Sequence, residues 1–404
     1  MNCKKFNSID YIAGGMLLYT LSVTVVFFYL PQYISWGVDV LALLITFYGV
    51  FRRGFNYGCI DKDILFVLSI MLLYSLFVIL QSLYLKNFNP PHIITQNYYA
   101  LPLLLPLISM LGIRKPEEMK KIYHYLFTGC VVCVIHFLIN GRNFVFNTTG
   151  VLRGMDADAD LGLYEFLRQV TLGQYLIVPL FVYYAIRKVE NHYHFLLISF
   201  ALILSTIITA LFGRRMATAT ILIMFFMPLF VNFVFGKHKF LYFIIMAVFL
   251  IGLIDLFDKI ADLFPILSER LTDNTREDFQ KQVFRQYEGL DFLFGRGVSA
   301  TYQDSLQGER GHMEAGYLSI IMREGIVYLL LYIYVLLVPA YRALIKGKNI
   351  FIKASGLFLV FECAQIAVAG MRTWSLPFMM VFIAISQCSD KRLRTTKDFE
   401  IFKL

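Results

Sequence analysis

The sequence predicts an all-α polytopic membrane protein with about twelve transmembrane helices. Hydrophobic residues make up 58% of its 404 residues and charged residues only 16%, whereas a soluble domain carries about 25% charge. The mean hydropathy is +0.64, and apolar runs follow one another almost without interruption. These observations favour a single membrane domain over residues 1–404 rather than several soluble domains.

A helix needs about 20 apolar residues to cross the hydrocarbon core of a bilayer. Twelve runs reach or approach this length, and the fourth and sixth are short and contain prolines. The predicted spans are 9–30, 33–50, 64–85, 98–113, 122–140, 170–186, 194–212, 216–235, 239–257, 314–341, 350–370 and 374–389.

Lysine and arginine cluster in alternate loops of this topology, beginning with Lys4 and Lys5 and ending with the basic residues after 390. The positive-inside rule therefore predicts that both termini lie in the cytoplasm. We expect a multi-pass protein of the bacterial inner (plasma) membrane. The net charge of +9 does not indicate nucleic-acid binding, because no basic stripe is present. Two substantial loops then face the periplasm: a smaller one at 141–169, and a large one at 258–313 between the ninth and tenth helices.

Residues that could carry chemistry gather on this outer side. An arginine pair ends the seventh span, and the large loop and the helix after it contain further arginines, a glycine-rich turn and a histidine. In chain order these residues are Arg214, Arg215, Arg276, Phe294-Gly295-Arg296-Gly297, His312, Glu314 and Arg323-Glu324-Gly325.

In order, spacing and side, this pattern resembles the O-antigen polymerase and ligase superfamily of bacterial polysaccharide assembly (Wzy-like and WaaL-like proteins). It differs from the common His-Asn pair of that family, since Met313 follows His312. The resemblance implies a GT-C-like membrane glycosyltransferase that takes a glycan from undecaprenyl diphosphate and needs no metal or other cofactor. The alternating Asp156, Asp158 and Asp160 do not make a calcium loop, because that pattern requires glycine and glutamate at positions occupied here by leucines.

The chemistry of such a reaction suits these residues. Guanidinium groups bind diphosphate oxygens through paired hydrogen bonds, which assigns this role to Arg276 and to Arg215 or Arg214. An acceptor hydroxyl loses a proton as it attacks, and His312 is the candidate general base. Membrane anchoring is the alternative for the arginines, and solvation is the alternative for His312. Glu314 orients His312 or caps the start of the next helix.

Further charged residues lie near or within the last spans. Arg372, between the last two spans and two residues before Trp374, either anchors the chain at the interface or binds glycan or phosphate. Arg323 and Glu324 in the tenth span and Glu362 in the eleventh are costly in lipid unless paired or hydrated. Counting along continuous antiparallel helices puts Arg323 and Glu362 at equal depth, so we expect an ion pair or a water-bridged contact between them that supports the site.

The sequence therefore predicts a polymerase that joins undecaprenyl-diphosphate-linked oligosaccharide repeats of O-antigen or capsule at the periplasmic face. The close alternative is a ligase that transfers the glycan to a lipid A core, and the alternative of another class is a lipid-linked glycan flippase. Expected partners are the lipid-linked oligosaccharide, membrane lipids and a chain-length regulator protein, but not nucleic acid. The sugar, the linkage and the oligomeric state do not follow from the sequence.

Overall fold

The structure is a computed structural model. It describes residues 6–23, 30–56, 58, 60–85, 100–113, 118, 121, 122, 124–129, 131, 132, 135, 139, 196, 199, 200, 203, 244, 275–304, 308–310, 316–368 and 374–396. The chain forms two compact units. The first comprises residues 1–23, 30–122 and 275–404, and the second comprises residues 24–29 and 123–274. The described positions of the second unit are helical, with a helical turn at 124–129.

Among the described residues, three helices of the first unit are long and apolar enough to cross a membrane. They are α3 (Gln32–Arg53), α4 (Lys62–Tyr84) and α15 (Gly316–Lys346). The first two match the predicted spans 33–50 and 64–85 within a few residues. The chain is thus a multi-pass membrane protein, as its composition predicts.

Helices α1 (Ser8–Leu21) and α3 pack closely because small residues lie at their contact. The side chain of Asn7 accepts a hydrogen bond from the backbone of Asp10 and begins α1 with a capping box. Gly15 of α1 lies against Ala42 and Thr46 of α3, and a Cβ atom there would collide with Thr46. Small residues at such positions let two membrane helices approach, where dispersion contacts are strongest.

Two predicted spans are shorter helices than expected. The fourth, 98–113, contains the 3-10 helix η2 (Leu101–Leu104) and the five-residue α6 (Pro106–Met110). Pro102 is the second residue of η2 and Pro106 begins α6, and a proline cannot donate the backbone hydrogen bond that a continuous helix requires. The last, 374–389, is α17 (Leu376–Ser389), which is 14 residues long and shorter than a bilayer crossing. Ser109 of α6 donates a hydrogen bond of 2.6 Å to the carbonyl of Phe382 in α17.

The remaining described elements complete the first unit. Helix α16 (Ile350–Val368) corresponds to the predicted span 350–370. Helix α18 (Lys391–Thr395) is short. The large loop predicted at 258–313 contains α13 (Thr275–Gln286), α14 (Leu290–Phe294) and an antiparallel hairpin of β1 (Tyr302–Asp304) and β2 (Gly308–Arg310). The predicted spans 170–186 and 216–235, the loop 141–169, and all but a few single positions of 122–140, 194–212 and 239–257 lie outside the described residues.

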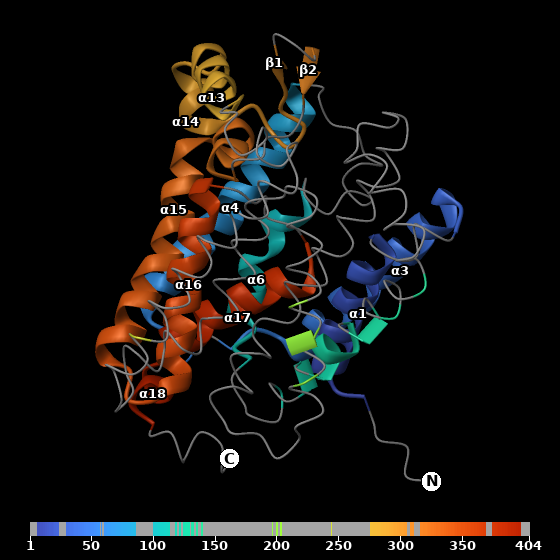
Figure 1. The fold of residues 1–404 in the computed structure, drawn as a ribbon, viewed down its shortest axis with the longest axis vertical. Helices are drawn as coiled ribbons and strands as arrows, with labels where there is room; N and C mark the ends of the chain where they lie inside the picture. The colour runs from blue at the N-terminus through green and yellow to red at the C-terminus, as the bar shows by residue number, and fades with distance from the viewer. Residues whose placement is uncertain are drawn as a thin grey trace. The chain divides into compact units, whose positions relative to one another are not determined.

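The first unit has two ends, which lie apart in Figure 1. The hairpin end carries α13, α14, β1 and β2, together with the last turn of α4. The α18 end carries α18, the start of α4 and the end of α15. Backbone hydrogen bonds from Asp61 to Ser389 and from Lys348 to Arg394 hold this end together. Several basic residues predicted to face the cytoplasm lie at this end, at the start of α4, at the end of α15 and in α18: Lys62, Arg342, Lys346, Lys348, Lys391, Arg392 and Arg394.

Candidate functional site at the break in α15

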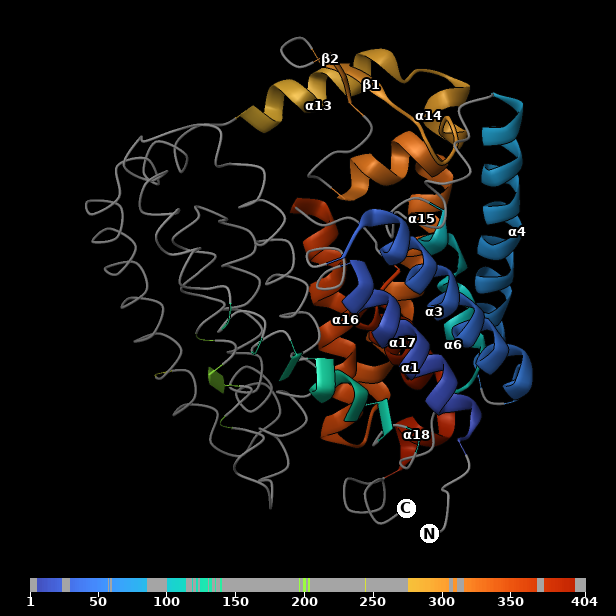
Figure 2. The same cartoon turned by 90° about the vertical axis from the view of Figure 1, so that its right-hand side faces the viewer.

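Helix α15 is two segments joined at Gly325. The backbone there has φ 80° and ψ 171°, outside the helical region, and Figure 2 shows the segment before it lying across the longer one. The longer segment runs from Ile326 to Lys346 and spans about 30 Å, the thickness of a bilayer core. Arg323 and Glu324 therefore lie at the break, not eight residues along a continuous membrane helix as the sequence analysis assumed.

The break exposes backbone carbonyls, and the turn at Phe294–Gly297 satisfies them. The backbone N–H of Arg296 donates to the carbonyl of Met322 at 2.9 Å, and that of Gly297 donates to the carbonyl of Arg323 at 3.1 Å. The last carbonyls of a helix have no partner within it. Two motifs that are about 30 residues apart in sequence are thus directly bonded.

Glycine is required on both sides of this contact. A Cβ atom on Gly295 would collide with the carbonyl of Arg323, and one on Gly325 would collide with the carbonyl of Leu293. Both glycines also have positive φ, 74° and 80°, a region that other residues rarely adopt. The expected turn at Gly295 and Gly297 is confirmed, and it serves as a docking surface for the broken helix.

The end of α4 holds the turn from its other side. Gln81 donates from Nε2 to the carbonyl of Gly295 at 2.7 Å, and the hydroxyl of Ser82 accepts from the backbone N–H of Val298 at 2.5 Å. Gly297 lies so close to Ser82 that a Cβ atom would overlap its hydroxyl. The turn therefore holds the break, and the end of α4 holds the turn.

An apolar cluster seats the rest of the hairpin end on the first segment of α15. Its buried members come from α13, the residues around β1 and α15, so that burial of apolar surface holds the three together. They are Val283, Tyr287, Ala300, Tyr302, Leu318 and Met322, with Tyr317 packed against them.

Arg296 and Tyr287 stabilise the turn through hydrogen bonds and a cation–π contact. Arg296 donates to the carboxylate of Asp291 at 2.8 Å and to the carbonyl of Gln286 at 2.6 Å, and its guanidinium lies 4.2 Å from the centroid of the Tyr287 ring. The Tyr287 hydroxyl donates to the carbonyl of Thr301 at 2.8 Å. Burial raises the pKa of Tyr287 to about 12, so this phenol remains a neutral hydrogen-bond donor at physiological pH.

The two charged residues beside Gly325 are almost completely buried. Arg323 and Glu324 are each 3% exposed, although ionised side chains are costly to bury. Arg323 acts electrostatically on the hydroxyl of Tyr287, and Glu324 acts on that of Tyr74 in α4. Buried ionisable residues in a membrane protein mark a functional site by default. This is the candidate site.

The other predicted site residues are only partly accounted for. Arg276 lies in the first turn of α13, at the same end as the break, and only its backbone is described. Arg214, Arg215, His312, Glu314 and Arg372 lie outside the described residues, so their convergence with Arg276 stays a prediction.

The expected ion pair between Arg323 and Glu362 does not form. Glu362 is buried within α16, and none of the ion pairs among the described residues joins it to Arg323. The break at Gly325 explains the difference, because it removes Arg323 from the straight helix on which equal depth was counted. The water-bridged alternative stays a prediction.

The sequence does not single out three residues of this site, because they belong to no motif: Tyr74, Gln81 and Ser82. A weak signal was present. Tyr74 and Gln81 are seven residues apart, which places two polar side chains on one face of an otherwise apolar helix. Their partners are more than 200 residues away in sequence, so no local pattern could have identified them.

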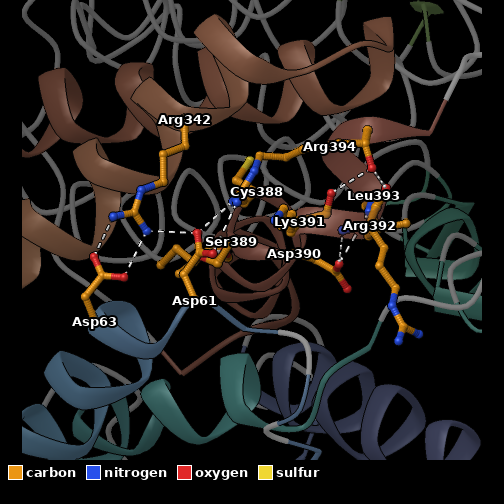
Figure 3. A network of polar contacts seen from close by, with 12 residues as sticks. Asp61, Asp63, Arg342, Cys388, Ser389, Asp390, Lys391, Arg392, Leu393 and Arg394 are labelled. Carbon is orange, nitrogen blue, oxygen red and sulfur yellow. Dashed lines mark hydrogen bonds and ion pairs between the residues drawn. The ribbon is translucent and has the colours of Figure 1, made fainter.

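The α18 end contains a second charged network, shown in Figure 3. Asp61 accepts hydrogen bonds from Arg342 at 2.8 Å and from Arg394 at 2.8 and 3.2 Å. Asp63 accepts from Arg342 at 2.7 and 3.0 Å, and Arg394 also donates to the carbonyl of Cys388 at 2.6 Å. Charge is balanced within the network, which ties α4, α15, α17 and α18 together. We assign it a structural role.

Comparison with known proteins gives no relatives, because no family model, curated protein or solved structure matches this chain. Within the described part of the chain, no group of three or more His, Cys, Asp or Glu residues could hold a metal ion.

Proposed function

We propose that the protein is a membrane glycosyltransferase that polymerises undecaprenyl-diphosphate-linked oligosaccharide repeats, as an O-antigen or capsule polymerase does. The observation that carries the proposal is the contact between the Phe294–Gly297 turn and the break after Arg323 and Glu324. These are two of the motifs on which the resemblance to the polymerase and ligase superfamily rests. Their direct bonding is what a shared site requires, whereas a chance resemblance does not require it.

The distribution of charge supports an outward-facing site in the bacterial inner membrane. The described basic residues at the start of α4, at the end of α15 and in α18 lie at the α18 end, which is the end expected in the cytoplasm. The hairpin end then faces the periplasm, where lipid-linked repeats are available. A site just above the hydrocarbon core suits a substrate whose lipid stays in the bilayer while its diphosphate and sugars stay in water.

The proposed mechanism needs only side chains of this chain. The arginines at 215 and 276 bind the diphosphate and neutralise the charge that develops as it leaves. His312 takes the proton of the acceptor hydroxyl as the glycosidic bond forms, and undecaprenyl diphosphate departs with the electron pair. Gly295 and Gly325 fix the break in α15, and the break positions Arg323 and Glu324 next to this site. The two charged residues support the site and take no part in the reaction.

Surface polysaccharide in a deletion strain tests the proposal. A polymerase predicts the loss of long chains while a single repeat is retained on the gel. Complete loss of core-attached repeats would instead identify a ligase, and loss of periplasmic lipid-linked repeats would identify a flippase.

A matched pair of variants on α13 then tests the assigned chemistry. Arg276→Lys keeps the charge but loses the two-pronged hydrogen bond, so it should fail to restore long chains. Arg285→Lys on the same helix, at an exposed position, should restore them fully.

A further inference from the structure

Helix α4 carries two buried polar atoms whose hydrogen-bonding capacity is unused. The Tyr74 hydroxyl and the amide oxygen of Gln81 are both buried, and neither has a hydrogen-bond partner among the described residues. A buried polar group without a partner costs about 1–3 kcal/mol. Such groups are rare in native structures, and each requires an explanation.

Both atoms flank the break in α15. The Tyr74 ring packs against that of Tyr328, one turn after Gly325, with centroids 5.6 Å apart. The Gln81 amide is fixed by its hydrogen bond to Gly295, which leaves its oxygen as a free acceptor. The two residues lie on one face of α4, separated by about 10 Å along the helix axis. The Glu324 carboxylate is near enough to act on the Tyr74 hydroxyl.

The chemistry of the two atoms defines the ligand. A phenol hydroxyl donates or accepts a hydrogen bond, whereas an amide oxygen only accepts. A ligand that satisfies both must donate to the Gln81 oxygen and must either donate to or accept from the Tyr74 hydroxyl about 10 Å away, as separate hydroxyl groups of one oligosaccharide can. A phosphate oxygen accepts only, and a lipid chain does neither. The ligand is therefore hydroxyl-rich.

We propose that this face of α4 is a glycan subsite of the site at the α15 break, in which the Tyr74 hydroxyl and the Gln81 amide oxygen bind sugar hydroxyls of the lipid-linked substrate. This inference rests on the proposed function and adds to it. None of the motifs of the resemblance includes α4. The subsite would bind the sugars, while the arginines of the outer loops would bind the diphosphate.

Tyr74→Phe is the decisive variant, because it removes only the hydroxyl oxygen and its proton. If the hydroxyl has no partner within the protein, its loss leaves the stability of the ligand-free protein unchanged or slightly higher. Tyr84→Phe is the matched control, since Tyr84 is on the same helix and is 85% exposed.

The measurement is the thermal unfolding midpoint of the full-length protein in detergent, titrated with two probes. One probe is undecaprenyl-diphosphate-linked oligosaccharide and the other is undecaprenyl diphosphate without sugars. We expect Tyr74→Phe to need about 3- to 10-fold more of the sugar-bearing lipid for half of the full shift, which corresponds to one lost hydrogen bond. Its response to the sugar-free lipid should equal that of the wild type and of Tyr84→Phe.

The outcomes separate the two proposals. Equal responses of Tyr74→Phe and wild type to the sugar-bearing lipid would overturn the subsite while leaving the polymerase intact. A midpoint of ligand-free Tyr74→Phe well below that of Tyr84→Phe would also overturn it, because the hydroxyl would then be structural. If neither lipid shifts the wild type, the proposed function fails, and the subsite fails with it.

Discussion

At the α18 end, carboxylates and guanidinium groups neutralise one another, and each arginine of the network bonds an acidic side chain at 2.7–3.2 Å. At the hairpin end, the contacts on either side of Arg323 and Glu324 are made by backbone atoms of a glycine-rich turn. The first arrangement balances charge and joins helices. The second holds two buried charged residues beside a contact so close that neither Gly295 nor Gly325 could carry a Cβ atom. This difference is the reason for which we propose the hairpin end, and not the α18 end, as the site.

The difference also predicts how each end responds to mutation. Variants at the α18 end should change the amount of folded protein and little else. Variants at the hairpin end should reduce chain elongation by more than they reduce folded protein.

The largest effect on elongation is expected from His312→Ala. Removal of a general base reduces a rate by about 100-fold or more, so long chains should disappear from the gel while the protein level in the membrane stays normal. His124→Ala, at an exposed position in the second unit, is the control and should elongate normally. Normal elongation by His312→Ala would exclude the histidine as the base.

Gly325→Val should destabilise the hairpin end and thereby abolish chain elongation. Valine cannot adopt φ 80° without strain, and its Cβ atom would collide with the carbonyl of Leu293. The combined cost is about 3 kcal/mol or more, which a thermal unfolding assay in detergent would detect. Gly37→Ala is the control, because open space surrounds that glycine. A Gly325→Val protein with the wild-type midpoint would show that the break is not required.

A smaller effect is expected from Ser82→Ala. This change leaves the N–H of Val298 without its acceptor, at a local cost of about 1–2 kcal/mol, and should lower elongation several-fold because the turn shifts. Hydrogen exchange at residues 293–298 should accelerate in parallel. Ser69→Ala on the same helix should change neither, since the Ser69 hydroxyl bonds only within α4, to Leu65. Unchanged exchange in Ser82→Ala would exclude the bracing role of α4.

The smallest effect on chain length is expected from Asp61→Ala, although it destabilises the protein. The change removes the carboxylate shared by Arg342 and Arg394, and Arg394 is only 7% exposed, so stability should fall by about 1–3 kcal/mol. The amount of protein should fall, but the chain-length distribution per molecule should stay normal. Asp63→Ala should cost less, because Asp63 is 39% exposed. Shortened chains at equal protein level would contradict a purely structural role for this end.

The sequence predicted the described long helices well and their interruptions poorly. Spans 33–50, 64–85 and 350–370 correspond to α3, α4 and α16 because each is one apolar run bounded by charge or turn residues. Gly325 belongs to a predicted motif, but the break in the helix there was not predicted, because a glycine within an apolar helix is often tolerated. Here its conformation is set by Leu293 and Gly295 in a turn 30 residues earlier.

The same limit applies to the polar partners. The positive-inside rule predicted that Arg342 and Arg394 lie on the same side, as their shared contact requires, but it could not name Asp61 as their common acceptor. Gln81 and Ser82 likewise bond a turn more than 200 residues away. Long-range hydrogen bonds depend on how helices pack, and helix packing is not encoded in local periodicity.

Reconstitution tests the central claim most directly. The purified full-length protein is placed in liposomes with undecaprenyl-diphosphate-linked oligosaccharide as the only substrate, without nucleotide sugar. We expect a ladder of lipid-linked chains of two or more repeats and release of one undecaprenyl diphosphate for each bond formed. If the substrate stays at one repeat and no undecaprenyl diphosphate is released, the protein is not a polymerase.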